Sequence, residues 1–120
     1  LLGKPTIFHF WSISCSLCKE AMPELQRFLQ QYKNVNVIAV HMPRSEGDLN
    51  LDAIQRMVQK LSIEHPVVID NKLTLSDAFN NQVVPSYYVF DRQGILRHYQ
   101  AGNSGMKLLQ KRMQRISGEI

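Results

Sequence analysis

The stretch Phe10-Trp11-Ser12-Ile13-Ser14-Cys15-Ser16-Leu17-Cys18-Lys19-Glu20 contains both cysteines of the 120-residue chain. It joins an apolar segment typical of a strand to a segment with the apolar spacing of a helix, so the cysteines fall at the expected start of that helix. A separation of three residues puts both sulfur atoms on one face of the first turn, within reach of a disulfide. The first-turn amides and the positive end of the helix dipole stabilise a thiolate, which is the reactive form of cysteine. The cysteines therefore indicate redox chemistry.

Two other uses of a cysteine pair remain as alternatives, a structural disulfide and a metal site. A disulfide stabilises a fold by closing a loop in the unfolded chain, and two intervening residues make that loop very small. A zinc site takes three or four protein ligands, so histidines would have to complete it. The four histidines, His9, His41, His65 and His98, show no spacing such as H-x₃₋₅-H. The sequence therefore favours a redox pair and no metal site.

The composition predicts one globular domain that spans residues 1–120. Hydrophobic residues make up 44% of the chain, enough for a sizeable core, and no linker-like or repeated segment divides it. No apolar run reaches the roughly 18 residues that span a membrane. The net charge is +4, and the basic residues near the end are Lys107, Lys111, Arg112 and Arg115. Because their spacing favours a solvated helix face, we expect no nucleic-acid partner. We also expect a monomer with no membrane segment within the chain.

The expected elements alternate between strands and helices. Segments 6–11 and 35–40 are apolar at nearly every position, as in strands buried on both faces of a sheet. Other strands are expected at 66–70, 86–90 and 95–99, helices at 15–32, 51–61, 73–79 and 105–117, and a polar loop at 42–50. Asp91-Arg92-Gln93-Gly94 joins the last two strands as a hairpin with glycine at its left-handed position. This order predicts an α/β fold with a mixed sheet flanked by helices on both faces.

The order of elements, with a CxxC pair after the first strand, resembles the thioredoxin fold. The stretch from Phe10 to Cys18 resembles the F-W-x-x-x-C-x-x-C motif of that family, and Pro23 resembles its helix-kinking proline. Val84-Pro85-Ser86 resembles the cis-proline loop, which in that family faces the disulfide and pairs with the substrate backbone. Gly102 resembles the glycine after the last strand. The resemblance covers nearly the whole chain and implies a thioredoxin fold.

Within the superfamily, the sequence resembles the bacterial TlpA/ResA-type proteins. Gly3-Lys4-Pro5 and Glu20-Ala21-Met22-Pro23-Glu24-Leu25 resemble their G-K-P and K-E-x-P-x-L motifs, and the inserted helix and strand between 51 and 70 point the same way. Those proteins are exported, often membrane-tethered, and reduce disulfides of clients such as apocytochromes. The resemblance implies an extracytoplasmic location, with the cytoplasm as the alternative. It also implies disulfide-bearing client proteins, an upstream partner that supplies electrons, and no cofactor.

Three positions depart from the family pattern. Leu17 replaces the proline that many members have between the cysteines, a dipeptide that sets the reduction potential. Ala21 stands where the apocytochrome-specific members carry a buried glutamate, which weakens a narrow role in cytochrome maturation. His9 lies where thioredoxin has a buried aspartate that handles protons for the second cysteine. We therefore consider two uses of His9, a core histidine bonded to the backbone and a proton carrier or electrostatic modulator for Cys18.

The sequence thus predicts a thiol–disulfide oxidoreductase that reduces protein disulfides. Cys15, at the helix start, is expected to attack the substrate disulfide, and Cys18, one turn further, to resolve the mixed disulfide. Trp11, Val84 and Pro85 are the expected substrate-binding residues. A thioredoxin-like metallochaperone is an alternative, although that family carries a C-x-x-x-C spacing. A non-catalytic binding module is another, although it would more naturally have lost a cysteine.

Overall fold

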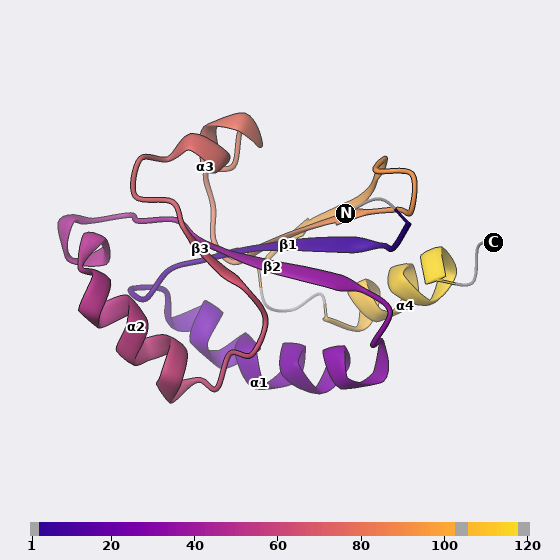
Figure 1. Cartoon of the computed structure of the whole chain (residues 1–120), viewed down its shortest axis with the longest axis horizontal. Helices are drawn as coiled ribbons and strands as arrows, with labels where there is room; N and C mark the ends of the chain where they lie inside the picture. Colours follow the sequence, from indigo (N-terminus) through magenta and orange to yellow (C-terminus); the bar gives the residue numbers. More distant parts are fainter. Residues whose placement is uncertain (1–2, 103–105, 118–120) are drawn as a thin grey trace.

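The computed structural model describes residues 3–102 and 106–117. Within them, five strands form one sheet in the order β3-β2-β1-β4-β5 (Figure 1). The strands are β1 Thr6–Trp11, β2 Asn36–His41, β3 Val67–Ile69, β4 Ser86–Phe90 and β5 Leu96–Ala101. Strand β1 is central, parallel to β2 and antiparallel to β4. The mixed sheet predicted from the order of elements is confirmed.

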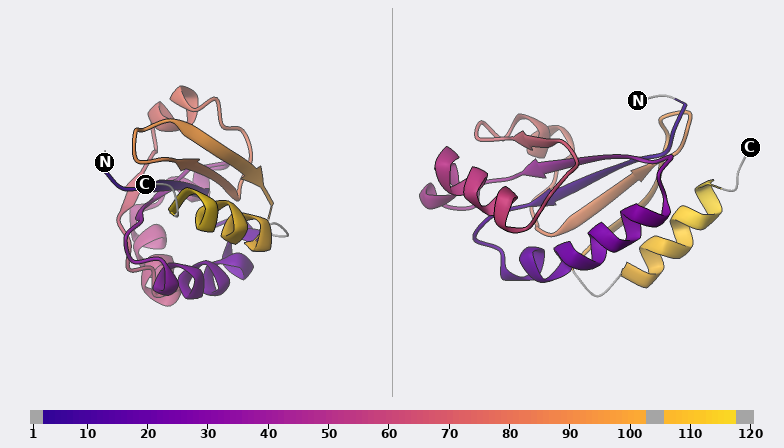
Figure 2. Two further views of the ribbon diagram at one scale, coloured as in Figure 1. Left: turned by 90° about the vertical axis from the view of Figure 1, so that its right-hand side faces the viewer. Right: turned by 60° about the horizontal axis from the view of Figure 1, so that its bottom comes forward.

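Helices lie on both faces of the sheet, as predicted, but unequally. They are α1 Ser16–Gln31, the 3₁₀ helix η1 Glu46–Leu49, α2 Leu51–Lys60, α3 Thr74–Ala78 and α4 Met106–Ser117. Helices α1, α2 and α4 cover one face, and α3 lies on the other (Figures 1 and 2). Helix α2 and strand β3 form the insertion expected after the second core strand. No helix in the described parts of the chain is long and apolar enough to cross a membrane.

Because side chains alternate along a strand, β1 contributes to a core on each face of the sheet. Ile7 and Trp11 pack in the core under α1 and α4, whose buried members include Cys15, Cys18, Met22, Leu25, Phe28, Leu109 and Met113. Phe10 packs on the other face, in a cluster with Val40, Met42 and Tyr88. The larger core therefore lies directly beneath the helix that begins at the cysteines.

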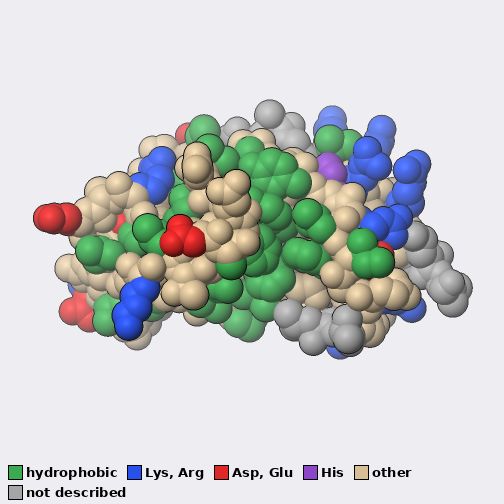
Figure 3. Space-filling model, turned by 90° about the horizontal axis from the view of Figure 1, so that it is seen from above, with side chains coloured by type: hydrophobic (Ala, Val, Ile, Leu, Met, Phe, Trp, Pro, Cys, Tyr) green, Lys and Arg blue, Asp and Glu red, His purple; other side chains and the backbone are tan. Residues whose placement is uncertain are grey.

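The face that α3 covers retains an apolar surface, because this helix has only five residues. A band of hydrophobic side chains runs across that face (Figure 3), and the half-buried Phe8, Phe79 and Phe90 belong to its cluster. The ring of Phe79 lies 5.0 Å from that of Phe8 and 5.3 Å from that of Phe10. Phe79, at the C-terminal end of α3, therefore holds this helix against the sheet.

Some element bounds differ from those predicted. The polar loop at 42–50 contains η1, and four residues are too few to show a helical period. Helix α3 begins one residue later than expected, because Leu73 has a left-handed backbone with φ of 60°. Strand β5 runs to Ala101 instead of ending at 99. Pro23 lies inside α1, as expected. The expected start of the last helix, at 105, lies outside the described residues.

Candidate active site

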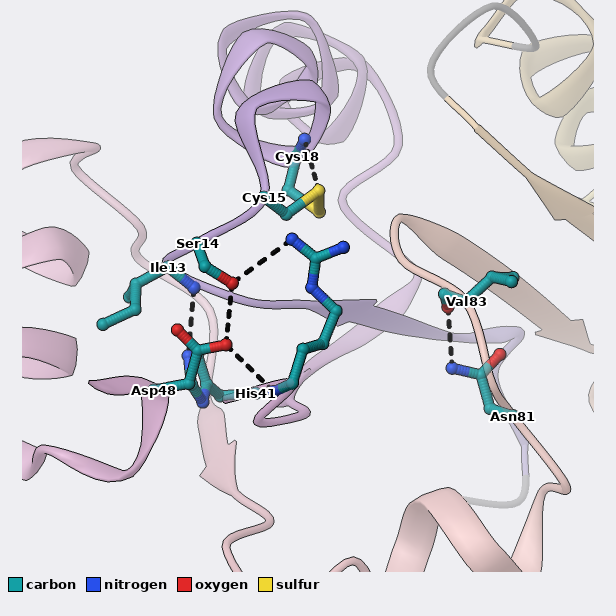
Figure 4. The surroundings of a disulfide bond; sticks show 9 residues. Ile13, Ser14, Cys15, Cys18, His41, Asp48, Asn81 and Val83 are labelled. Carbon is teal, nitrogen blue, oxygen red and sulfur yellow. Dashed lines mark hydrogen bonds between the residues drawn. A yellow bond between two sulfur atoms is a disulfide. The ribbon is translucent and has the colours of Figure 1, made fainter. Parts of the chain in front are cut away.

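Cys15 and Cys18 form a disulfide at the N terminus of α1 (Figure 4). Their Cα atoms lie 5.3 Å apart, as expected for two residues that share a first helical turn. Cys15 is the N-cap of α1, and its Sγ accepts a 3.1 Å hydrogen bond from the N–H of Cys18. This amide belongs to the first turn, which has no helical acceptors, so it can stabilise a thiolate on Cys15. Cys15 is 4% exposed and Cys18 is fully buried, so reagents in solution meet Cys15 first.

A tight turn carries the chain from β1 to Cys15. The N–H of Cys15 donates to the carbonyl of Ser12 over 3.1 Å, which closes the turn. The N–H of Ile13 points out of the turn and donates to Nε2 of the buried His41 over 3.1 Å (Figure 4). The imidazole also meets the indole of Trp11 edge-on, with ring centres 5.1 Å apart. Sequence reasoning considered His41 only as a metal ligand and missed this contact, which joins residues 28 apart.

A second contact holds the same turn through Ser14. The hydroxyl of Ser14 donates to Oδ2 of Asp48 over 2.7 Å, and the backbone N–H of Arg44 donates to the same oxygen over 2.9 Å. The guanidinium of Arg44 in turn donates to Oγ of Ser14 over 3.2 Å. Asp48 is 2% exposed and belongs to η1. The 3₁₀ helix that the sequence did not predict therefore supplies a buried carboxylate next to the cysteine turn.

The peptide bond between Val84 and Pro85 is cis, as predicted. Strand β4 follows directly, and Ser86 pairs with Phe10 near the end of β1. The Val84–Pro85 loop therefore lies at the end of the sheet from which the cysteine turn leaves. Val84 is half-buried and packs against the core cluster that contains both cysteines.

Asn81 fixes the loop before Pro85 and was not identified from the sequence. Its Oδ1 accepts hydrogen bonds from the hydroxyls of Ser86, over 2.8 Å, and Tyr88, over 2.9 Å. Its Nδ2 donates to the carbonyl of Val83 over 2.9 Å (Figure 4). The buried amide thus links the loop to the first residues of β4, and a polar residue in a polar loop gives no signal of such a role.

The AhpC/TSA family model matches residues 1–99. The chain belongs to the AhpC/TSA family. A relative, the thiol-disulfide oxidoreductase YkuV of Bacillus subtilis (strain 168), is 54% identical over 121 residues, which cover 99% of this chain and 82% of YkuV. The thiol-disulfide oxidoreductase ResA of Halalkalibacterium halodurans is 25% identical, covering 99% of this chain and 66% of ResA.

A solved structure agrees with the arrangement of this AhpC/TSA family member. The solution structure of a thioredoxin-like protein in the oxidized form is 54% identical and covers 97% of this chain and 80% of that one, with a TM-score of 0.87. The thioredoxin fold predicted from the sequence is therefore confirmed. The chain is a thiol–disulfide oxidoreductase with its cysteines in CxxC spacing, and its relatives include the ResA type.

His9 lies in the middle of β1 and is fully buried. It pairs across the sheet with Tyr87, and the two rings stack with centres 4.8 Å apart. Among the described residues, neither ring nitrogen of His9 has a hydrogen-bond partner, so the structure does not support the backbone-bonded histidine considered above. Burial lowers the pKa of His9 to about 3, and the positive charge of His65 contributes in the same direction. The imidazole is therefore neutral at physiological pH.

Tyr87, the partner of His9, is also an unusual buried group. Its hydroxyl has no hydrogen-bond partner within the described part of the chain. Burial raises the pKa of Tyr87, and the negative charge of Glu24 raises it further. In residues 3–102 and 106–117, no three His, Cys, Asp or Glu side chains are placed to hold a metal ion together. His9 and Tyr87 thus form a buried pair of neutral rings, of which the imidazole can accept a proton.

Proposed function

We propose that the chain reduces disulfides of client proteins through Cys15 and Cys18. The thiolate of Cys15 attacks one sulfur of the client disulfide, and the other client sulfur leaves as a thiolate. The thiolate of Cys18 then attacks Sγ of Cys15, which releases the client as a dithiol and leaves the Cys15–Cys18 disulfide. The client gains two electrons and two protons, and the cysteine pair loses them. The supporting observation is the asymmetry of the pair: Cys15 caps the helix with some surface exposed, whereas Cys18 is fully buried.

We propose that the client binds at the Val84–Pro85 loop. Within the described residues, neither the N–H nor the carbonyl of Val84 has a backbone hydrogen-bond partner, so both can pair with an extended client chain. The carbonyl of Pro85 is already bonded to the N–H of Gly102 over 2.8 Å. Trp11 is fully buried in the same core cluster as both cysteines. Leu17, 47% exposed between the cysteines, offers an apolar contact.

We also propose that His9 serves the resolving step. Its ring lies on the face of the sheet that α1 covers, stacked on Tyr87, which packs in the same core as Cys18. An imidazole with two unpartnered nitrogens can take up a proton or respond to a negative charge nearby. A thiolate on Cys18 would favour the charged form of His9 and raise its pKa, which couples the two titrations.

The cellular setting is a further proposal, which rests on the resemblance to exported relatives. We place the protein outside the bacterial cytoplasm, either tethered to the membrane or free in the periplasm, with the cytoplasm as the alternative. It would act as a monomer of one domain, residues 1–120, and receive electrons from an upstream redox partner. Ala21, buried in α1, leaves no carboxylate where the apocytochrome-specific members have glutamate, so we propose clients other than apocytochromes alone.

Cysteine variants test the assignment of the two thiols. Limiting iodoacetamide should modify Cys15 of the reduced protein first, because the helix start lowers a thiol pKa from about 8.5 towards 7 or below. Cys15→Ser should abolish reduction of insulin disulfides. Cys18→Ser should instead accumulate a mixed disulfide with insulin, because the resolving thiol is missing. Equal labelling of both thiols, or insulin reduction by Cys15→Ser, would show that the assignment is wrong.

The reduction potential of the pair tests the direction of electron flow. Thioredoxin-like reductants lie near about −270 mV and strong oxidants near about −120 mV. Equilibration of the pair against dithiothreitol and glutathione buffers should give a potential close to the first value. A potential close to the second would assign the protein to disulfide formation.

A further inference from the structure

We propose that His41 is a positioning residue for Cys15, holding the turn that presents this cysteine through the hydrogen bond from Ile13 to Nε2. The inference rests on the proposed function and adds a residue to it. His41 ends β2, and its backbone pairs with Trp11 at the end of β1. The side chain therefore stands beside the point where the chain leaves the sheet for the cysteines.

The geometry of the turn explains why an acceptor is needed there. The hydrogen bond from Cys15 to Ser12 joins the first and fourth residues of the turn. In such a turn the N–H of the second residue, here Ile13, has no acceptor inside the turn. Ile13 is half-buried, and an N–H that is shielded from water without a partner is unfavourable. Nε2 of His41 provides the partner over 3.1 Å. This bond links the middle of the turn to the end of β2, and the bond from Ser14 to Asp48 links it to η1.

The protonation of His41 follows from the direction of this bond. Because a backbone N–H is always the donor, Nε2 must carry a lone pair and the ring proton must lie on Nδ1. Within the described residues Nδ1 has no partner. A phenylalanine could pack edge-on against Trp11 without an unsatisfied Nδ1–H, but it would leave the N–H of Ile13 without its acceptor. The acceptor at Nε2 is what the imidazole provides beyond its shape.

The turn matters to the chemistry because it sets the position of the Cys15 sulfur. In the present arrangement that sulfur accepts the N–H of Cys18 over 3.1 Å. A turn released from His41 allows Cys15 to leave the N-cap position, and its thiolate then loses this stabilising amide. The reactivity of Cys15 should therefore fall although no group that touches the sulfur has changed.

Two substitutions separate the acceptor from the ring. His41→Phe keeps an aromatic ring beside Trp11 but has no acceptor, whereas His41→Gln places a carbonyl oxygen close to the position of Nε2 but has no ring. For the reduced proteins, we would measure the alkylation rate of Cys15 at pH 7 and the hydrogen exchange of the Ile13 amide. His98→Gln on β5 is the matched control, because it makes the same chemical change away from the turn.

The expected result is a pattern opposite to that of a packing residue. His41→Phe should slow alkylation of Cys15 about tenfold and speed exchange at Ile13 about tenfold, the size of one hydrogen bond. His41→Gln and His98→Gln should stay within about threefold of the wild type. Wild-type rates in His41→Phe, or an equal loss in both His41 variants, would overturn the inference. If His41→Phe does not fold, His41→Gln alone is the test. A tenfold loss in its alkylation rate with the Ile13 amide still protected from exchange would overturn the inference. Wild-type rates of alkylation and exchange would support it.

The test is independent of the client assay. Alkylation and exchange report on Cys15 and Ile13 even if the wild-type protein does not reduce insulin, and that failure would count against the proposed function alone. The rate of insulin reduction by the same variants is the additional readout. It should follow the alkylation rates, because both start from the thiolate of Cys15.

Discussion

Replacing His9 should make the free energy of unfolding depend much less on pH in the acidic range. Burial lowers the pKa of His9 to about 3 in the folded chain, against about 6.5 in the unfolded chain. Between these two values the unfolded chain binds one more proton than the folded chain at this site. The free energy of unfolding is therefore intact above about pH 6.5 and falls as the pH is lowered towards 3.

The magnitude follows from the pKa difference. At pH 4.5, which lies about two units below the pKa of His9 in the unfolded chain, the imidazole is protonated in the unfolded chain and still neutral in the folded chain. Each of these units lowers the free energy of unfolding by about 1.36 kcal/mol. After subtraction of the small effect already present at pH 7, neutral His9 accounts for a loss of about 2.5 kcal/mol between pH 7 and pH 4.5. This is a large share of the 5–15 kcal/mol typical of a folded domain. The pKa of His65, lowered by burial to about 4, contributes with the same sign in the wild type and in a His9 variant.

Urea unfolding of the oxidised protein at the two pH values measures this difference. His9→Phe should lose about 2.5 kcal/mol less than the wild type on going from pH 7 to pH 4.5. Val89→Ala is the matched control, since Val89 is fully buried on the neighbouring strand and does not titrate. It should lower the free energy of unfolding by the same amount at both pH values. An identical pH dependence of His9→Phe and the wild type would refute the argument, because His9 would then titrate alike in the folded and unfolded chains.

Two further predictions concern residues around the cysteines. Asn81→Leu leaves two hydroxyls and one carbonyl without their partner; we expect a loss of about 2–4 kcal/mol in urea unfolding and a larger loss in kcat/KM for insulin than in the alkylation rate of Cys15. Equal losses in both rates would show that Asn81 does not act through the Val84–Pro85 loop. His9→Asn should change the pH dependence of the resolving step, followed by stopped-flow after the mixed disulfide has formed, and leave the first attack by Cys15 almost unaltered. An unchanged pH–rate profile would reduce His9 to a packing residue.

The parts of the fold that the sequence predicted are those that local chemistry decides. The hairpin glycine is an example, since Gly94 has a φ of 81°, which few other residues adopt. Leu73 adopts a φ of 60° before α3 without any sequence signal. Its conformation is fixed by hydrogen bonds from its N–H to Asp70 and from Asp77 to its carbonyl. These two bonds are local, but a leucine gives no signal of a left-handed backbone, so the start of α3 was missed. In η1, by contrast, Asp48 makes a tertiary contact with Ser14, which lies 34 residues away.

The same distinction separates the predicted from the unpredicted part of the active site. The cysteine pair and the cis-proline are local motifs, so they could be identified from neighbouring residues alone. The contacts that hold the cysteine turn join Ile13 to His41 and Ser14 to Asp48, over 28 and 34 residues. Neither pair has the spacing of a known motif, and from the sequence both His41 and Asp48 could equally have been surface residues. Only the packing of η1 and the end of β2 against the turn brings them together.

His9 shows how burial limits the chemistry that a residue can perform. A base works best when its pKa lies near the operating pH, and a pKa of about 3 in the oxidised protein makes His9 a weak base. The negative charge that forms on Cys18 during reduction acts in the opposite direction and raises that pKa. A proton-carrier role therefore requires the pKa of His9 to rise on reduction, which NMR titration of the imidazole in both redox states measures directly. A pKa that stays near 3 in the dithiol form would leave the Cys18 proton to solvent, and His9 would then stabilise only the fold.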